Sequence, residues 1–121
     1  MRARAIPKGE RLRRPSEFQA VFQGGRRVER PAVLLVWNQA QGEEKAGFTV
    51  SRQIRGAVSR NRARRRVREA YRASGHSLPR RVQVVFVARR SALNEPFVDL
   101  CREVRDGLEV IANGCATVEG H

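Results

Sequence analysis

The order of helix and strand signals along this 121-residue chain predicts an α+β two-layer sandwich. Three observations lead to that prediction. Three segments place their apolar residues at helical spacing, four short apolar or mixed runs have the length of strands, and the elements follow one another as α-β-β-β-α-β-α. This order is typical of a split β-α-β arrangement, in which a sheet carries helices mainly on one face and leaves the other partly open. The length suits one domain with one core.

The first element is a short helix that begins at Pro15-Ser16-Glu17 and is stopped by Gly24-Gly25. Phe18, Val21 and Phe22 follow the i, i+3, i+4 pattern within it. Two phenylalanines one turn apart are more often core than ligand platform. Because these two lie between basic segments, a base-stacking role stays open; we expect one ring to be largely buried and Phe18 to be the more exposed.

Strands are expected at 25–29, 32–38, 46–51 and 82–88. The first is weak and short, since Pro31 interrupts it. We expect the second and third to form a hairpin through the polar turn at 39–45. The fourth is almost wholly apolar and is expected to be a central strand buried on both faces.

The most informative stretch is 56–72, which contains seven arginines and one acid, Glu69. Ala, Arg and Glu favour a helix over 57–72, with Ser59 near its N-cap. A narrow, mostly small apolar face is expected from four residues: Ala63, Val67, Ala70 and Tyr71. The arginines form a ridge beside it. Guanidinium groups one turn apart repel one another, so the ridge favours a polyanionic partner over a merely solvated face.

A last helix is expected from a cap at Asn94 to Asn113-Gly114. Its apolar residues recur at helical spacing, and the acids Asp99, Glu103 and Asp106 lie on the opposite, solvent-facing side. The expected organisation is a basic flexible arm at 1–14, a single α+β domain at 15–113 and a flexible tail at 114–121.

The net charge of +13 is unevenly distributed. Residues 1–94 carry 23 basic and 6 acidic side chains, whereas residues 95–121 carry 2 basic and 6 acidic ones. A basic body with a weakly acidic end indicates a nucleic-acid partner for the body.

Catalytic signals are missing from the sequence. The acids before residue 95 are scattered, no phosphate-binding glycine loop occurs, and Cys101 and Cys115 lack metal-site spacing, so we expect no metal site in the protein and no catalysis by the polypeptide alone. We find no membrane-spanning run and no signal peptide, and we expect a cytoplasmic protein.

The stretch Gly56-Ala57-Val58-x-Arg60-Asn61-x-x-Arg64-Arg65-x-x-Arg68-Glu69 resembles the signature of the bacterial ribonuclease P protein component. The resemblance covers roughly residues 11–110. It implies a fold like that of the second domain of ribosomal protein S5, with a left-handed β-α-β crossover. It also implies a small, monomeric subunit, one per RNA, of a ribonucleoprotein that removes 5′ leaders from precursor tRNA. The RNA subunit would be the catalyst and would use Mg²⁺.

The resemblance also implies site residues. Those that would contact the RNA subunit are Arg60, Asn61, Arg62, Arg64, Arg65 and Arg68. Those that would contact the precursor tRNA leader are Phe18, Phe22, Arg52 and Arg89. The chain departs from the family pattern at Gln53, where a basic residue is frequent, and at Val36, where an aromatic residue often lines the cleft.

Three other interpretations remain open. A ribosomal or RNA-chaperone-type protein without linked nuclease activity fits the composition equally well. A DNA-binding regulator would need a compact helix-turn-helix, but the neighbours of 57–72 have strand patterns. A free-standing nuclease is disfavoured by the scattered acids.

Overall fold

The computed structural model describes residues 12, 14–39, 44–74, 78–79 and 81–119, and it confirms the predicted α+β two-layer fold. The elements in chain order are α1 (Pro15–Gly24), β1 (Arg26–Glu29), β2 (Val33–Gln39), β3 (Lys45–Val50), α2 (Ala57–Ala73), β4 (Val82–Ala88), the short 3-10 helix η2 (Arg90–Leu93) and α3 (Phe97–Glu119). The predicted stops and starts of α1, α2 and the strands agree with these bounds to within about two residues.

The four strands form one sheet in the order β1-β2-β4-β3. β4 pairs antiparallel with β2 and parallel with β3, so the predicted hairpin between β2 and β3 is wrong. The apolar strand β4 lies between them because it buries both faces only in the interior of the sheet. The parallel pair β3 and β4 is connected through α2, as parallel neighbours require a crossover.

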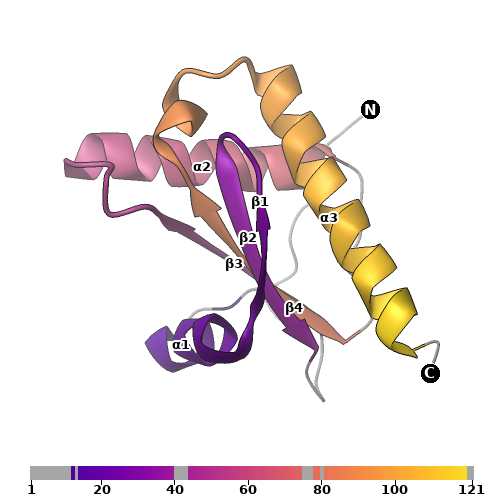
Figure 1. Cartoon of the computed structure of the whole chain (residues 1–121). Coiled ribbons are helices and arrows are strands. Elements are labelled where there is room, and N and C mark those ends of the chain that lie inside the picture. Colours follow the sequence, from indigo (N-terminus) through magenta and orange to yellow (C-terminus); the bar gives the residue numbers. More distant parts are fainter. Residues whose placement is uncertain (1–11, 13, 40–43, 75–77, 80, 120–121) are drawn as a thin grey trace.

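Helices cover the two faces of the sheet unequally. Figure 1 shows α2 and α3 on one side and the short α1 on the other. The larger core lies under α2 and α3, where the rings of Phe48, Tyr71 and Phe86 pack with centroids 5.3–5.8 Å apart. A smaller cluster lies under α1 and includes Val21 and Val36. Leu34 and Val87 on this side of the sheet are only partly buried, so α1 leaves part of this sheet face open.

The buried face of α2 matches the predicted one, because Ala63, Val67, Ala70 and Tyr71 are all buried. The predicted cap is wrong: Gly56, at φ 87°, occupies the N-cap position, and Ser59 lies inside the first turn. Only glycine adopts this backbone conformation readily, which explains why the chain turns into the helix here.

The limits of α3 also differ from the prediction. Asn94 ends η2, and α3 begins at Phe97 after Pro96. The helix continues through Asn113 and Gly114 to Glu119. A Cβ on Gly114 would lie 3.2 Å from the Trp37 ring, so this glycine allows close packing on β2 instead of ending the helix.

Leu12 precedes the predicted domain start at residue 15, yet it is buried and its N–H donates to the Ala46 carbonyl at 2.8 Å. Most of the predicted basic arm, residues 1–11 and 13, lies outside the described residues, as do 40–43, 75–77, 80 and 120–121. The domain limits stay a prediction. None of the helices within the described ranges combines the length and apolar character needed to cross a membrane.

Candidate RNA interface

A cavity of about 490 Å³ opens on the part of the sheet that α1 leaves uncovered. Its floor is apolar, formed by Leu34 of β2 and Val87 of β4, which are direct partners across the two strands. Its rim is polar and cationic. The residues of the rim are Pro31, Ser51, Gln53, Arg89, Arg90 and Ser91.

Arg89 is held at this rim by three contacts. Its backbone N–H donates to the Ala32 carbonyl at 2.9 Å. Its guanidinium donates to the Arg30 carbonyl at 3.2 Å and to the Glu29 carboxylate at 2.8 Å. The side chain is therefore directed across the end of β2 toward β1, while it keeps about a third of its surface exposed.

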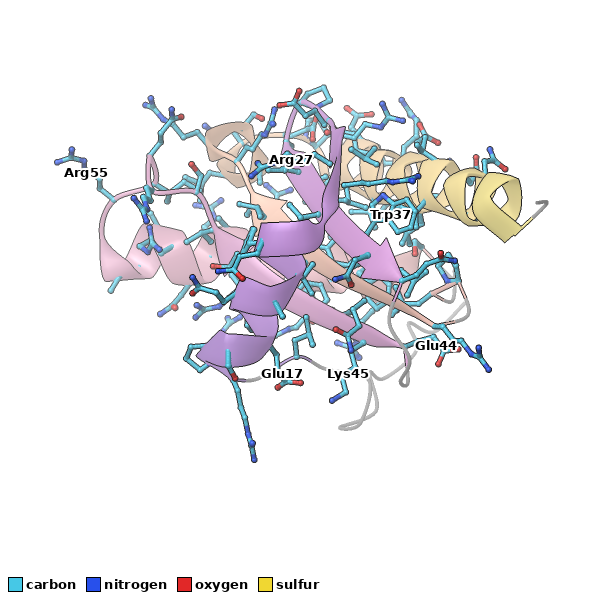
Figure 2. The ribbon with its side chains drawn as sticks, turned by 60° about the horizontal axis from the view of Figure 1, so that its bottom comes forward. Glu17, Arg27, Trp37, Glu44, Lys45 and Arg55 are labelled. Carbon is cyan, nitrogen blue, oxygen red and sulfur yellow. The ribbon has the colours of Figure 1, made fainter. Side chains whose placement is uncertain are left out.

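A second hollow of about 370 Å³ adjoins the first and shares Gln53 and Arg90 with it. It is also lined by Arg55 and by Ser59 in the first turn of α2. Figure 2 shows Arg55 projecting from the molecule on the segment before α2. The two hollows together form a basic path from the open sheet face to the start of α2.

The predicted leader residues lie in different surroundings. Arg89 lines the cavity, whereas the exposed Arg52 lies between two lining residues, Ser51 and Gln53, without lining it. Phe18 and Phe22 pack against the small cluster under α1 and are both partly buried. The expectation that one ring is largely buried and that Phe18 is the more exposed stays a prediction.

The ring of Phe18 lies close against the backbone of a neighbouring strand. It rests on Gly47 of β3, where an added Cβ would lie 2.8 Å from the ring. A larger residue at this position would push α1 away from the sheet. Glu17 fixes the same helix by accepting from Lys45 Nζ at 3.1 Å, and Figure 2 shows the two side chains together below α1.

Some arginines of α2 are exposed and others are partly buried. Arg62, Arg64 and Arg65 are exposed, as is Asn61, which accepts a hydrogen bond from Arg64. Arg68 is partly buried.

Two further arginines of α2 bind backbone carbonyls. Arg60 donates to the carbonyls of Ser51 (3.2 Å) and Ile54 (2.9 Å), and so fixes the segment that precedes the helix. Arg66 donates to the carbonyls of Ala92, Leu93 and Glu95 at 2.7–3.1 Å. Helical spacing alone does not separate the arginines that bind carbonyls from those that are exposed, because the carbonyls belong to segments outside α2.

No sequence pattern indicated the carboxyl pair of Glu95 and Glu103 that lies behind the cavity. Glu103 was expected on the solvent face of the last helix, but its carboxylate accepts from the Ala32 N–H at 2.7 Å. Burial, a hydrogen bond to Glu103 and the negative charges of Glu103 and Asp99 raise the pKa of Glu95 to about 7, against an opposing effect of Arg66. The expectation of a solvent-facing Glu103 is therefore wrong; the pair joins α3 to the strand end that carries Arg89.

Other rim residues could have been recognised. Arg90 directly follows Arg89, and Gln53 and Arg55 lie in the segment between β3 and the basic helix. A basic run at the end of a strand is a signal for phosphate contact. The position of Glu29, by contrast, depends on strand pairing and has no sequence signal.

The sequence is similar to those of one known protein family. A family model described as ribonuclease P matches residues 6–112. The ribonuclease P protein component of Chloroflexus aurantiacus is 44% identical over 92 residues, which cover 74% of this chain and 68% of that protein. The corresponding protein of Symbiobacterium thermophilum is 38% identical over 106 residues, which cover 86% and 92%.

Solved structures show the same fold. The ribonuclease P protein of Staphylococcus aureus superposes with a TM-score of 0.70 at 20% identity, over 86% of this chain and 96% of that one. The Thermotoga maritima protein gives 0.70 at 22% identity, over 84% and 96%. With a matching family model over most of its length and relatives above 30% identity, this chain belongs to the ribonuclease P protein component family.

Proposed function

We propose that this chain is the protein subunit of ribonuclease P and that it binds two RNA molecules at once. One is the catalytic RNA subunit, and the other is the 5′ leader of precursor tRNA. The observation that carries the proposal is the basic-rimmed cavity on the open sheet face, which leads directly to the start of the arginine-rich α2. One protein molecule binds each RNA subunit, in the cytoplasm.

The cavity suits a single strand. An unpaired base can pack against the apolar floor of Leu34 and Val87 while its phosphates meet the guanidinium groups of Arg89 and Arg90. Bases inside a duplex are stacked and cannot reach the floor. Phe18 and Phe22 lie over the neighbouring part of this sheet face, and Arg52 adds charge beside the rim. This arrangement favours tRNA that still has its leader.

The exposed face of α2 suits a structured RNA. Arg62, Arg64 and Arg65 are exposed on a rigid helix, and guanidinium groups bind phosphates in a bidentate manner. We assign contacts with the RNA subunit to Arg60, Asn61, Arg62, Arg64, Arg65 and Arg68. Within this set, Arg60 also orders the segment between β3 and α2.

The chemistry of leader removal is assigned to the RNA subunit, with Mg²⁺ bound mainly by RNA and substrate phosphates, the oxygen ligands it prefers. When bound there, Mg²⁺ supplies a metal-activated water and neutralises developing charge. In the part of the chain that the structure describes, no three carboxylate, imidazole or thiol side chains form a metal-sized cluster. The protein's own residues bind and orient the substrate.

Reconstitution tests the proposal. The protein alone should not cleave precursor tRNA, and a bacterial ribonuclease P RNA with Mg²⁺ at moderate salt should give cleavage at the mature 5′ end that the protein enhances. Site-specific cleavage by RNA-free protein would contradict it. The second candidate, a ribosomal or RNA-chaperone-type protein, is tested by the RNA that copurifies: ribosomal RNA would favour it, and a single structured RNA of another kind would favour ribonuclease P.

A further inference from the structure

The cation at the cavity rim has an acidic neighbour. Glu29, at the end of the edge strand β1, accepts a hydrogen bond from the Arg89 guanidinium at 2.8 Å. The two residues are 60 positions apart in sequence, and β2 lies between their strands. Arg89 is therefore already bound to a carboxylate at the place where the proposed function needs it for a phosphate.

Strand register places Glu29 on the cavity side of the sheet. Glu29 pairs with Leu34, and Leu34 pairs with Val87, so the three side chains form one row across β1, β2 and β4. Directly paired residues share a face of the sheet. Leu34 and Val87 are the apolar floor, and hence Glu29 is the next residue along the same row, at the edge of that floor.

The ion pair is easily displaced. The Glu29 side chain is 73% exposed and the Arg89 side chain 34% exposed, and ion pairs in such surroundings are weak because water and salt screen them. The second guanidinium contact, to the Arg30 carbonyl, is long at 3.2 Å. A phosphate group can replace the carboxylate on Arg89 Nη2, since guanidinium binds both kinds of anion.

We propose that Glu29 competes with the leader phosphate for Arg89 and so limits how tightly the cavity binds the leader. This inference rests on the proposed function of the cavity. A leader phosphate must replace the Glu29 carboxylate at Arg89, so this contact adds less to binding than an unpaired guanidinium would. The base that packs on Leu34 and Val87 does not meet this competition, so the leader still binds, but less tightly than it would without Glu29.

The test compares precursor tRNA carrying a leader with mature tRNA, each bound to the holoenzyme reconstituted with a bacterial ribonuclease P RNA. The variants are Glu29→Gln, Arg89→Ala, their combination, and Glu44→Gln. Glu44 is the matched control because it precedes β3, at the opposite edge and the opposite end of the sheet, and Figure 2 shows it far from Arg55. Both Glu-to-Gln changes raise the net charge by the same amount.

We expect Glu29→Gln to strengthen binding of the leader-bearing substrate about two- to five-fold at about 0.1 M salt, the range for an exposed ion pair, relative to Glu44→Gln. The gain should shrink at higher salt, should be absent for mature tRNA and should disappear in the Arg89→Ala background. Melting temperatures should stay unchanged, which separates competition from a structural role.

Two other results have distinct meanings. If Arg89→Ala reduces the preference for the leader but Glu29→Gln behaves like Glu44→Gln or weakens binding, then Glu29 does not compete and the inference is overturned. If Arg89→Ala leaves the preference for the leader intact, the cavity does not hold the leader at Arg89, and both the leader-binding proposal and the inference fail.

Discussion

The carboxyl group of Glu95 is hydrogen-bonded to that of Glu103, directly behind the strand end that carries Arg89. Glu103 binds the Ala32 N–H, and the Ala32 carbonyl binds the Arg89 N–H. Ala32 thus connects the Glu95–Glu103 pair to Arg89 at the cavity rim. Protonation of this pair bears on the stability of the part of the fold that presents Arg89.

Stability should fall as pH rises toward 7. Burial, the hydrogen bond to Glu103 and nearby negative charge raise the pKa of Glu95 from 4.5 to about 7, so between these values the folded protein holds a proton that the unfolded chain has lost. The stabilising contribution is complete below pH 4.5 and is lost through pH 7. Glu95→Gln, which keeps a donor for Glu103, should raise the melting temperature at pH 8 by about 3–8 °C and have little effect near pH 4.5.

Calorimetry or thermal circular dichroism at both pH values measures this effect, with Glu44→Gln as the control for net charge. If Glu95→Gln changes the melting temperature equally at pH 4.5 and pH 8, then Glu95 does not lose its proton between these two pH values.

Arg65 and Arg66 are adjacent in sequence and should respond differently to truncation. Arg65 is exposed, so Arg65→Ala should leave the fold intact and weaken binding of the RNA subunit. If α2 and nearby groups neutralise about 5–8 phosphates, log K against log salt has a slope of about −4 to −7, and the variant should be shallower by about one unit. Filter binding at several salt concentrations measures the slope.

Arg66→Ala is the matched comparison. It leaves the carbonyls of Ala92, Leu93 and Glu95 without their charged donor and should cost about 2–3 kcal/mol of unfolding free energy, measured by urea denaturation. Its salt slope should stay near that of the wild type. A normal slope for Arg65→Ala would mean that this arginine is only solvated.

Phe18 and Phe22 are both half-buried under α1, so each ring has a packed side and an accessible side. Truncation to Ala should cost less than the roughly 3–5 kcal/mol of a fully buried phenylalanine. The variants should stay folded and bind the RNA subunit, and they should lose part of the preference for precursor over mature tRNA. The measurements are the melting temperature and the two affinities. A large loss of stability in both variants with an intact leader preference would remove the rings from the leader site.

Gly107 should not tolerate a methyl group although it lies inside a helix. A Cβ at this position would lie 2.8 Å from two methyl carbons of Leu35, which is fully buried on β2 and has little room to move. Overpacking of this kind costs about 1–3 kcal/mol, which should exceed the helix-propensity gain of about 1 kcal/mol. Gly107→Ala should therefore destabilise the protein in urea unfolding.

The control is Gly24→Ala at the end of α1, where an added Cβ meets no atom within 4 Å. That variant should be neutral or slightly more stable. Equal behaviour of the two glycine variants would show that α3 can move away from β2 at little cost.

Local patterns in the sequence predicted the helices and strands and the basic chemistry of the main surface. Periodicity of side chains is a local property, so it located α1, α2 and the strands and identified the buried face of α2 at Ala63 and Val67. Charge is equally local, and the arginine signature indicated both an RNA partner and the family. A local pattern can also mislead. The Asn113-Gly114 pair is a common helix end and predicts that α3 stops there, but the helix continues to Glu119.

Tertiary structure alone decided which segments meet. Strand order depends on how much apolar surface each strand can bury, and β4 therefore separates β2 from β3 although a hairpin between them is shorter in sequence. The same long-range pairing brings Glu29 to Arg89 and Glu95 to Glu103. Arg65 and Arg66 have the same side chain. The carbonyl groups around Arg66 give it a structural role, whereas Arg65 is exposed and can contact solvent or phosphate.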